Sequence, residues 1–326
     1  MLSLKKILIC SLGSIGRRYV RLVHELLPSV KIAVYRSGYG ASCVEDELIT
    51  CQFYSHTEAL RWKPDAVIIA SPASVHIQQA LEFSSAGVPL LIEKPLGTGF
   101  ENELLLRSLV DLTKSFPILL GYVFRHDNCV KWLKNKYQSG VIGDLVEADF
   151  YCGSWLPDWR PNTDYRMGVS ARKNLGGGVL LELSHEFDLA NFLLDETVYL
   201  HSAFMSQSGA LDLSVEDRVV ICSSTNNGAV LTFRLNFCTN PPRRTILLRG
   251  TKGELSCDTL RGKVVYTSGC GDTQTYNHFS HPDERFRTQL RHFIKCIADE
   301  ESPVCTVHDG INVLNLIHEI RSRSHF

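Results

Sequence analysis

Ile7-Leu8-Ile9-Cys10-Ser11-Leu12-Gly13-Ser14-Ile15-Gly16 is the stretch that decides the fold of the N-terminal part of the chain. Its first four residues are apolar and predict a buried strand, and the amphipathic run that begins at Arg17 predicts a helix. The small residues between them let backbone N–H groups approach an anion at the N-terminus of that helix. The spacing matches the dinucleotide-binding fingerprint G-x-G-x-x-G, except that Ser11 replaces the first glycine. The order strand, turn and helix therefore indicates a site for a nucleotide pyrophosphate.

The composition is that of a soluble globular protein. The 326 residues suffice for two domains, and 44% of them are hydrophobic and 21% charged. The net charge of −1 excludes bulk electrostatic attraction to nucleic acid or to an anionic membrane, so neither is expected as a partner. No apolar stretch is long enough to span a bilayer. We interpret the short apolar run after Lys5-Lys6 as a strand and not as a secretion signal.

The eleven cysteines are scattered and form no C-x-x-C pair. Several stand in apolar runs, so we expect buried thiols in the reducing cytoplasm. Cysteines and histidines do not cluster with the spacing of metal ligands, and no metal is expected.

Strands and helices alternate over about 120 residues, which predicts a right-handed, doubly wound parallel sheet. Ligands of such sheets bind outside the carboxyl ends of the strands. The expected strands after the first are the apolar runs 31–35, 66–70, 89–92 and 118–120, with a helix over 101–116 before the last.

The end of the second strand bears on the choice of cofactor. Arg36 and Ser37 stand twenty positions after Gly16, where an acidic residue would bind a ribose 2′-OH. An arginine there suits a 2′-phosphate, with Ser37 as a further donor, so we favour NADP(H) over NAD(H). The alternative is an ordinary solvated arginine before a flexible Gly38-Tyr39-Gly40 loop.

Two further strand ends carry Ser71-Pro72 and Lys94, and a helix that carries His76 follows the former. Lys94 lies between Glu93 and the rigid Pro95, which suits a lysine placed for proton transfer beside an oxidised nicotinamide; a solvated lysine at a strand end is the alternative. Because these strand ends meet at one edge of the sheet, we expect one crevice. The residues assigned to the cofactor are Ser11, Gly13, Ser14, Ile15, Gly16, Arg36, Ser37, Ser71, Pro72, His76, Glu93 and Lys94.

The second half of the chain has a different pattern, in which strands dominate and the helices are set apart. This pattern predicts an α+β domain on a mostly antiparallel sheet. The expected strands are 145–155, 197–206, 217–224, 229–237, 244–249 and 263–267, and the expected helices are 128–139, 283–298 and 308–322.

A glycine run, 176–178, precedes a segment in which Glu182, His185 and Asp188 follow one another at intervals of three. On one helix these side chains would share a face, and a histidine between carboxylates can act as an acid or base near neutral pH. A half-buried histidine with surface carboxylates is an equal alternative. An aromatic and basic loop, residues 155–173, precedes this segment. We interpret it as a substrate lid, and the alternative is that its tryptophans only anchor the loop.

The chain resembles the glucose-fructose oxidoreductase / inositol dehydrogenase (Gfo/Idh/MocA) family over essentially its whole length. The segments that carry the resemblance are the dinucleotide turn, Glu93-Lys94-Pro95, Gly121-Tyr122 and residues 176–188. The resemblance implies a Rossmann domain over 1–121. It also implies an open-faced, mostly antiparallel β-sheet domain with helices on one face over 122–326, for substrate binding and oligomerisation. Its expected activity is NAD(P)-dependent oxidation or reduction of a sugar, cyclitol or nucleotide sugar, in a cytoplasmic homodimer or homotetramer.

By position, Lys94 is similar to the family's lysine beside the nicotinamide, and His185 resembles its acid/base. Glu182 matches a position usually held by an aspartate, although three residues separate acid and histidine here where many relatives have four. The Trp-Arg-Pro and Asp-Tyr-Arg stretch resembles a subgroup associated with surface-polysaccharide or nonulosonic-acid sugars.

We therefore expect hydride transfer to or from a sugar-like, anionic substrate, with Lys94, His185 and Glu182 as the catalytic residues. A non-catalytic dinucleotide-binding sensor and an NAD-dependent glycosidase are the alternatives. The residues expected to bind the substrate are Arg125, Trp159, Arg160, Tyr165, Arg166, Arg172 and Asp188.

Overall fold

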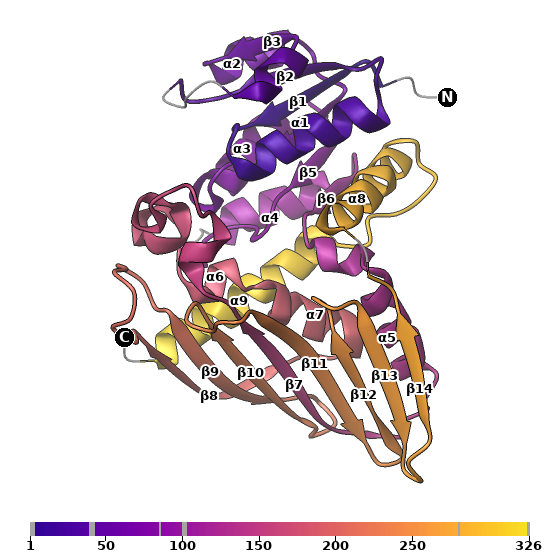
Figure 1. Ribbon diagram of the computed structural model, residues 1–326. Helices are drawn as coiled ribbons and strands as arrows, with labels where there is room; N and C mark the ends of the chain where they lie inside the picture. Colours follow the sequence, from indigo (N-terminus) through magenta and orange to yellow (C-terminus); the bar gives the residue numbers. More distant parts are fainter. Residues whose placement is uncertain (1–3, 39–42, 85, 100–102, 280, 325–326) are drawn as a thin grey trace. The chain divides into compact units, whose positions relative to one another are not determined.

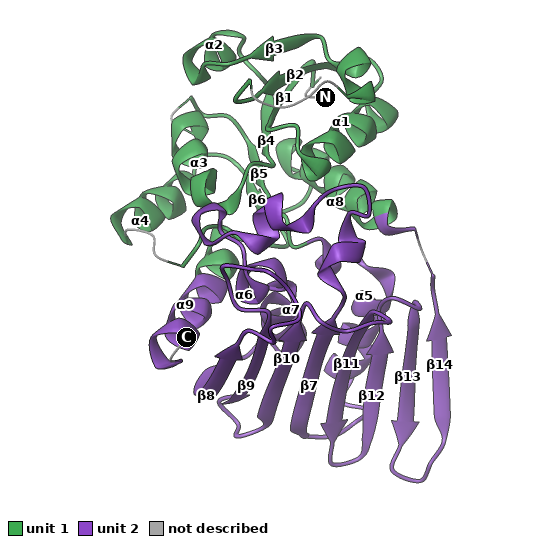
Figure 2. Cartoon of the chain, turned by 60° about the vertical axis from the view of Figure 1, so that its left-hand side comes forward, with its two compact units in different colours: residues 1–122, 283–311 green, residues 123–282, 312–326 purple. Residues whose placement is uncertain are grey.

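The computed structural model describes residues 4–38, 43–84, 86–99, 103–279 and 281–324. The chain divides into two compact units, coloured separately in Figure 2. The first comprises residues 1–122 and 283–311, and the second comprises 123–282 and 312–326. The first boundary lies next to the expected one, but the expected division did not place 283–311 with the first unit.

The first unit contains a six-stranded sheet in which every pair of neighbours is parallel (Figure 1). Its strand order, β3-β2-β1-β4-β5-β6, confirms the doubly wound Rossmann arrangement. The central strands are apolar throughout because helices cover both faces of such a sheet. The strands are β1 (Lys6–Cys10), β2 (Lys31–Tyr35), β3 (Cys51–Phe53), β4 (Ala66–Ile69), β5 (Leu90–Ile92) and β6 (Ile118–Leu120).

The helices of this sheet follow its strands in the chain. The expected helix over 101–116 is observed from Glu103 to Leu112, and its expected start lies outside the described residues. The helices are α1 (Ser14–Leu26), α2 (His56–Arg61), α3 (His76–Ser84) and α4 (Glu103–Leu112), with 3-10 turns η1 (Val44–Leu48) and η2 (Ala73–Val75).

Helix α8 (Pro282–Ile297) packs on α1 although more than 250 residues separate them. Asp283 pairs with Arg18 at 2.8 Å, and Arg287 donates to Glu25 at 2.7 Å. The Phe286 ring meets the edge of Tyr19 with centroids 5.9 Å apart. These contacts explain why this late segment belongs to the first unit.

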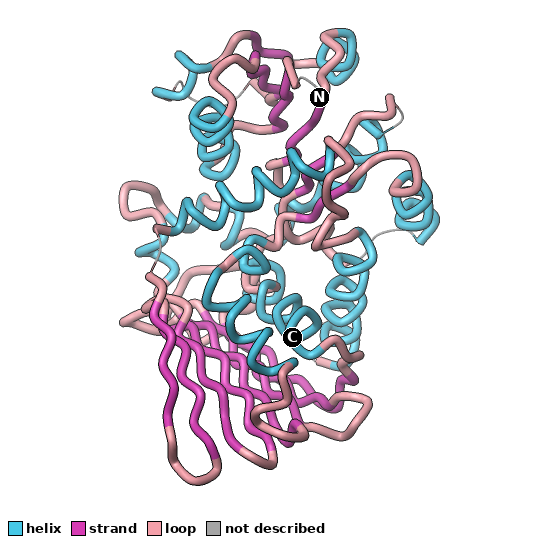
Figure 3. The backbone as a smooth tube through the Cα atoms, turned by 90° about the vertical axis from the view of Figure 1, so that its right-hand side faces the viewer, coloured by secondary structure: helices cyan, strands magenta, loops and turns pink. Residues whose placement is uncertain are grey.

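The second unit contains an eight-stranded sheet in the order β14-β13-β12-β11-β7-β10-β9-β8, visible as one layer of strands in Figure 3. All neighbours are antiparallel except β7 and β10. The strands are β7 (Leu145–Gly153), β8 (Tyr199–Ser206), β9 (Arg218–Ser224), β10 (Val230–Asn236), β11 (Arg243–Gly250), β12 (Gly253–Asp258), β13 (Lys263–Ser268) and β14 (Thr273–Asn277).

Helices cover one face of this sheet. Helix α5 contacts β12, β13 and β14, α6 contacts β9 and β10, and α7 contacts β7. The other face is open and carries apolar side chains, among them Phe204 at 65% and Val220 at 49% exposure. The helical segments are η3 (Val123–His126), α5 (Asn128–Gln138), η4 (Leu156–Trp159), η5 (Tyr165–Met167), η6 (Val169–Ala171), η7 (Lys173–Leu175), α6 (Val179–Glu182), α7 (His185–Leu194) and α9 (Val307–Arg323), which starts in the first unit.

The covered face forms a core of three aromatic rings, all fully buried. Phe150 and Phe233 stack with centroids 5.0 Å apart, and the Phe187 ring meets Phe233 edge-on at 5.2 Å.

Among the described helices, none has the length and hydropathy that a membrane crossing requires.

Removal of the central ring tests this core. We expect Phe233→Ala to lower the free energy of unfolding by about 3–5 kcal/mol, because it leaves a cavity between the two neighbouring rings. Leu260→Ala, at a site 42% exposed, is the control and should cost less than about 0.5 kcal/mol. Urea unfolding followed by circular dichroism measures both, and equal losses would contradict this description of the core.

Candidate functional site

The turn between β1 and α1 has the geometry of an anion site. Ser11 adopts a φ of +75°, the left-handed region that favours glycine, and its N–H donates to the Tyr35 carbonyl at 2.7 Å. A Cβ on Gly16 would lie 2.1 Å from the Ser11 carbonyl oxygen, so only glycine fits there. Gly13, at the N-cap of α1, has no side chain to cap the helix, and the first turn holds no acidic residue. The turn therefore fits a pyrophosphate.

Arg36 follows β2 as expected, but a carboxylate lies beside it. Its side chain is 10% exposed, and Nη1 lies 3.6 Å from Asp46 Oδ1 and 3.4 Å from Gln52 Oε1. Asp46 also accepts the Cys43 N–H at 2.9 Å. The guanidinium therefore follows β2, and Asp46 balances part of its charge. Residues 39 and 40 of the expected loop lie outside the described residues.

His76 ties together the segments that follow β4 and β5. Its Nδ1 lies 2.8 Å from the Pro95 carbonyl oxygen and its Nε2 lies 2.8 Å from that of Ser71. Each tautomer of the neutral ring donates to one of them. The Ser71 hydroxyl donates to Gln79 at 2.5 Å. The ring is 1% exposed, so the structure gives His76 a structural link between strand ends that the sequence did not predict.

Lys94 follows β5 and is half-buried, next to the buried carboxylate of Glu93. Burial raises the pKa of Glu93, although hydrogen bonds from Tyr19 and the nearby Lys94 and Arg18 charges act to lower it. The strand order places the ends of β2, β1, β4 and β5 side by side. The candidate cofactor residues Arg36, Ser11, Ser71 and Lys94 therefore lie along one edge of the sheet.

In the second unit, the prediction of one helix through Glu182, His185 and Asp188 is wrong. Helix α6 ends at Glu182, and α7 begins at His185 after a break at Leu183-Ser184. Ser184 is the N-cap of α7, but its backbone is helical and its side chain makes no capping hydrogen bond. Glu182 and His185 thus belong to different helices, and the regular intervals of three do not describe one helical face.

Aromatic and charged side chains surround His185. Its ring meets the edge of Phe124 with centroids 5.1 Å apart, and the Arg244 guanidinium lies 3.8 Å over that same Phe124 ring. Arg244 forms two hydrogen bonds to Glu186, at 2.7 and 3.0 Å. Burial opposes the charge of Arg244, but the Glu186 carboxylate outweighs it and raises the arginine pKa. Nothing in the local sequence around Phe124, Glu186 or Arg244 predicts this cluster.

Arg125 and Asp188 form a buried ion pair. The side chains are 4% and 1% exposed, and Arg125 donates to Asp188 Oδ1 from Nη2 at 2.6 Å and from Nε at 3.0 Å. Two residues that were predicted to bind the substrate are therefore paired with each other in the structure.

In the loop before α6, Trp159 has the geometry of an anchor, the alternative that the sequence left open. Its Nε1 donates to Ser154 Oγ at 2.7 Å, and its ring meets the edge of Phe237 at 5.3 Å. Arg166 pairs with Asp164 on the surface, and Arg172 donates to the Arg166 carbonyl at 3.2 Å. Arg160 is exposed in the same loop.

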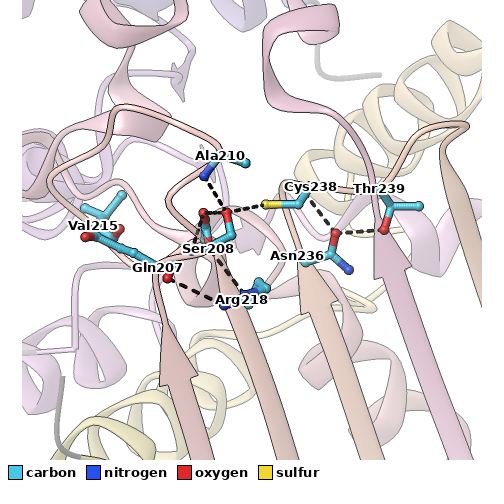
Figure 4. A network of polar contacts seen from close by, with 9 residues as sticks. Gln207, Ser208, Ala210, Val215, Arg218, Asn236, Cys238 and Thr239 are labelled. Atoms are coloured by element: carbon cyan, nitrogen blue, oxygen red, sulfur yellow. Dashed lines mark hydrogen bonds and ion pairs between the residues drawn. The ribbon is translucent and has the colours of Figure 1, made fainter.

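A second loop, residues 207–217, is fixed by the polar network of Figure 4. Asp217 is fully buried and accepts the Ser208 N–H at 2.8 Å and its hydroxyl at 2.5 Å. The Ser208 oxygen lies 3.2 Å from Cys238 Sγ, beside the strand end at Asn236 (Figure 4). The Asp212 N–H donates to the Tyr165 hydroxyl at 3.1 Å, so this loop also holds Tyr165.

Within the described ranges, no group of three or more His, Cys, Asp or Glu side chains could hold a metal ion.

Two family models match the chain. Residues 5–112 match the model described as "Oxidoreductase family, NAD-binding Rossmann fold", and residues 130–256 match the "GFO/IDH/MocA C-terminal domain". The first match lies within the first unit and the second match lies within the second unit.

Curated relatives are about a quarter identical to this chain over the aligned residues. Scyllo-inositol 2-dehydrogenase (NAD(+)) of Bacillus subtilis (strain 168) is 24% identical over 265 residues, 76% of this chain and 71% of that protein. The 2,7-anhydro-N-acetylneuraminate hydratase of Escherichia coli (strain K12) is 23% identical over 202 residues, 60% of this chain. That alignment spans 51%, about half, of the hydratase.

Among solved structures, the WlbA dehydrogenase from Bordetella pertussis, in complex with NADH and UDP-GlcNAcA, has a similar fold. The TM-score is 0.78 at 18% identity, and the match covers 98% of this chain and 96% of that one.

The buried pair beside His185 gives a stability prediction. We expect Asp188→Ala to cost about 3–5 kcal/mol, because it leaves the Arg125 charge buried without its counter-ion. Asp164→Ala removes the exposed partner of Arg166 and should leave the free energy of unfolding nearly unchanged. Urea unfolding compares the two variants. A loss for Asp188→Ala as small as that for Asp164→Ala would show that the Arg125–Asp188 pair is unimportant for stability.

Proposed function

Because the chain belongs to the Gfo/Idh/MocA family of NAD-binding oxidoreductases, we propose that it transfers a hydride reversibly between nicotinamide C4 and a carbinol or ketone carbon of a sugar, cyclitol or nucleotide sugar. The observation that carries the proposal is the position of Lys94. It follows β5 at the edge of the sheet where the β1–α1 turn fits a dinucleotide. The bound cofactor supplies the hydride acceptor or donor.

The chain's own residues supply orientation and proton transfer in this proposal. The Lys94 ammonium binds the reacting oxygen and polarises it, and His185 takes or returns the hydroxyl proton. Glu182 supports His185, whose ring orientation is limited by its contact with Phe124. Fixed placement of both groups supplies much of the rate.

We propose NADP(H) as the favoured cofactor. Arg36 supports it, because its guanidinium follows β2 and no acidic residue stands at that position. Asp46 opposes a second negative charge beside Arg36 and so limits the preference.

We propose an anionic sugar-like substrate, in a pathway of surface-polysaccharide or nonulosonic-acid sugars. The exposed cation Arg160 supports an anionic group, and Arg172 and Arg166 lie in the same loop, where Asp164 balances the Arg166 charge. Tyr165, which is held by Asp212, is proposed to contact the sugar, and the buried Arg125–Asp188 pair is proposed to contribute to the substrate site. The Bordetella pertussis protein named above was solved with a UDP-sugar acid, which is compatible with this class.

The open face of the second sheet supports a homodimer or homotetramer, because exposed Phe204 and Val220 would be buried in such a contact. The cysteines support a reducing compartment, the cytoplasm: all eleven lie among the described residues and none forms a disulfide.

The relative named as a hydratase favours a second candidate, transient oxidation without net turnover of the cofactor. Addition of water involves no net redox change, so the cofactor would be regenerated in each cycle. The two candidates use the same cofactor site. They differ in whether the cofactor leaves it with a changed oxidation state or is regenerated there.

Substitution of the two proposed catalytic residues tests the first candidate. Lys94→Ala and His185→Asn should each lower kcat by roughly 10²–10⁴-fold while the protein still binds the cofactor. Lys114→Ala, an exposed lysine paired with Asp111, is the matched control. The assay follows nucleotide-sugar conversion and NADP(H) consumption together. Full turnover by Lys94→Ala would refute the mechanism, and product without net cofactor consumption would select transient oxidation.

The cofactor preference has its own test. Arg36→Ala should weaken NADPH binding by roughly tenfold or more relative to NADH, because it removes a charge-assisted hydrogen bond to the 2′-phosphate. Asp46→Asn should tighten NADPH binding, and Arg61→Ala, at an exposed position of α2, should change neither affinity. Titration of nicotinamide fluorescence measures each affinity. A wild type that binds NADH far better than NADPH would overturn the proposed preference.

A further inference from the structure

Two buried polar residues form a hydrogen-bonded chain to Glu93, the residue that precedes Lys94. Tyr19, in α1, and Gln289, in α8, are both 0% exposed. The Tyr19 hydroxyl donates to Glu93 Oε1 at 2.6 Å, and Gln289 Nε2 donates to the Tyr19 oxygen at 2.7 Å. The three side chains form one hydrogen-bonded chain, Gln289–Tyr19–Glu93, inside the first unit.

The other oxygen of the same carboxylate reaches the proposed catalytic residue. Glu93 Oε2 accepts the backbone N–H of Lys94 at 3.2 Å. The carboxylate therefore links helix α1 to the segment that carries Lys94. Gly121 leaves the room for this arrangement, since a Cβ there would lie 3.0 Å from both Cα and Cδ of Glu93. Glu93 has little freedom to move away from Tyr19.

Each packed element presents identified groups to Glu93. Helix α1 presents Tyr19 and the positive charge of Arg18, α8 presents the neutral Gln289, and Lys94 adjoins it in the chain. Burial raises the pKa of Glu93, and these groups offset that effect only in part. Because the pKa is raised, Glu93 contributes stability at acid pH, and that contribution is lost as the pH rises through the pKa of the folded state.

The chain of three side chains can satisfy either protonation state of Glu93. When Glu93 is ionised, Tyr19 donates to it and Gln289 donates to Tyr19. When Glu93 is protonated, it can donate to Tyr19, which can donate to the amide oxygen of Gln289 after rotation of that amide. Gln289 Oε1 is buried and has no hydrogen-bond partner among the described residues, so it is available for this role.

We infer that Tyr19 and Gln289 are positioning residues that act through the Glu93 carboxylate to hold Lys94 in place for the reaction. The inference rests on the proposed function, because it concerns what Lys94 does there. It adds a requirement that the β5 motif alone does not contain: the helix α8 near the C-terminus must supply an amide to the site.

Chemical labelling of Lys94 tests its placement without any substrate. Brief acetylation with acetic anhydride, followed by peptide mass spectrometry, gives the rate at Lys94 relative to the exposed Lys114 of the same molecule. We expect Tyr19→Phe to label Lys94 several-fold faster than wild type, because the carboxylate and the Lys94 backbone lose their tie to α1. Phe286→Leu alters packing on Tyr19 but leaves the hydrogen bonds, and should match wild type. Equal labelling in Tyr19→Phe and wild type would overturn the inference.

Infrared titration of the carboxylic-acid C=O band, assigned by its loss in Glu93→Gln, tests the chain itself. Tyr19→Phe should raise the midpoint of Glu93 by about 1 pH unit, because one hydrogen bond to the charged form is lost. Gln289→Leu should raise it less, and Phe286→Leu should leave it unchanged. An unchanged midpoint in Tyr19→Phe would overturn the role of the chain. Neither readout depends on turnover, so an inactive wild type or an active Lys94→Ala would refute the proposed function and not these results.

Discussion

The buried carboxylate of Glu93 is the interaction on which the candidate site of the first unit depends. It lies 6% exposed between a hydroxyl from α1 and a backbone N–H after β5. A buried charge is tolerated only where hydrogen bonds replace water, so the surrounding elements have to remain in place. Gln289 completes the set from α8. This requirement gives a physical reason why a helix from the end of the chain packs with the N-terminal sheet.

In the second unit, buried carboxylates are compensated by ion pairs with arginines. Arg125–Asp188 and Arg244–Glu186 both use carboxylates from the first two turns of α7, the helix that begins at His185. Buried pairs of this kind add little net stability compared with apolar residues, but the loss of one partner is costly. They therefore fix the start of α7, and with it the backbone of His185, more than they strengthen the fold.

Much of the architecture is predictable from the sequence because its signals are local. The apolar runs that become β1, β2, β4, β5 and β6 are continuous, as strands covered on both faces must be. The turn at Ser11–Gly16 is recognisable from its spacing, and the position of Lys94 follows from the strand before it. In the second unit, alternating apolar residues predict β7 to β11 and β13 within a few residues.

The rest depends on contacts between distant residues or on weak patterns. β14, Thr-Gln-Thr-Tyr-Asn, is an edge strand without an apolar face, and β3 has only three residues. The break between α6 and α7 is absent from the periodicity of the segment, which reads as one helix. Asp46 beside Arg36, Arg244 beside Glu186 and Gln289 beside Tyr19 pair across 10 to 270 positions, and no local motif indicates such partners.

In the proposed function, a hydride passes between the nicotinamide and a sugar carbon. Its most direct test uses NADPH carrying deuterium at C4, on either face of the ring, with a panel of keto nucleotide sugars. Mass spectrometry of the product is the measurement. We expect the product to gain one deuterium at the carbinol carbon, from one face of the ring only, while one NADP⁺ forms per molecule. Product that carries no deuterium, or a cofactor that binds and transfers no label to any sugar, would contradict it.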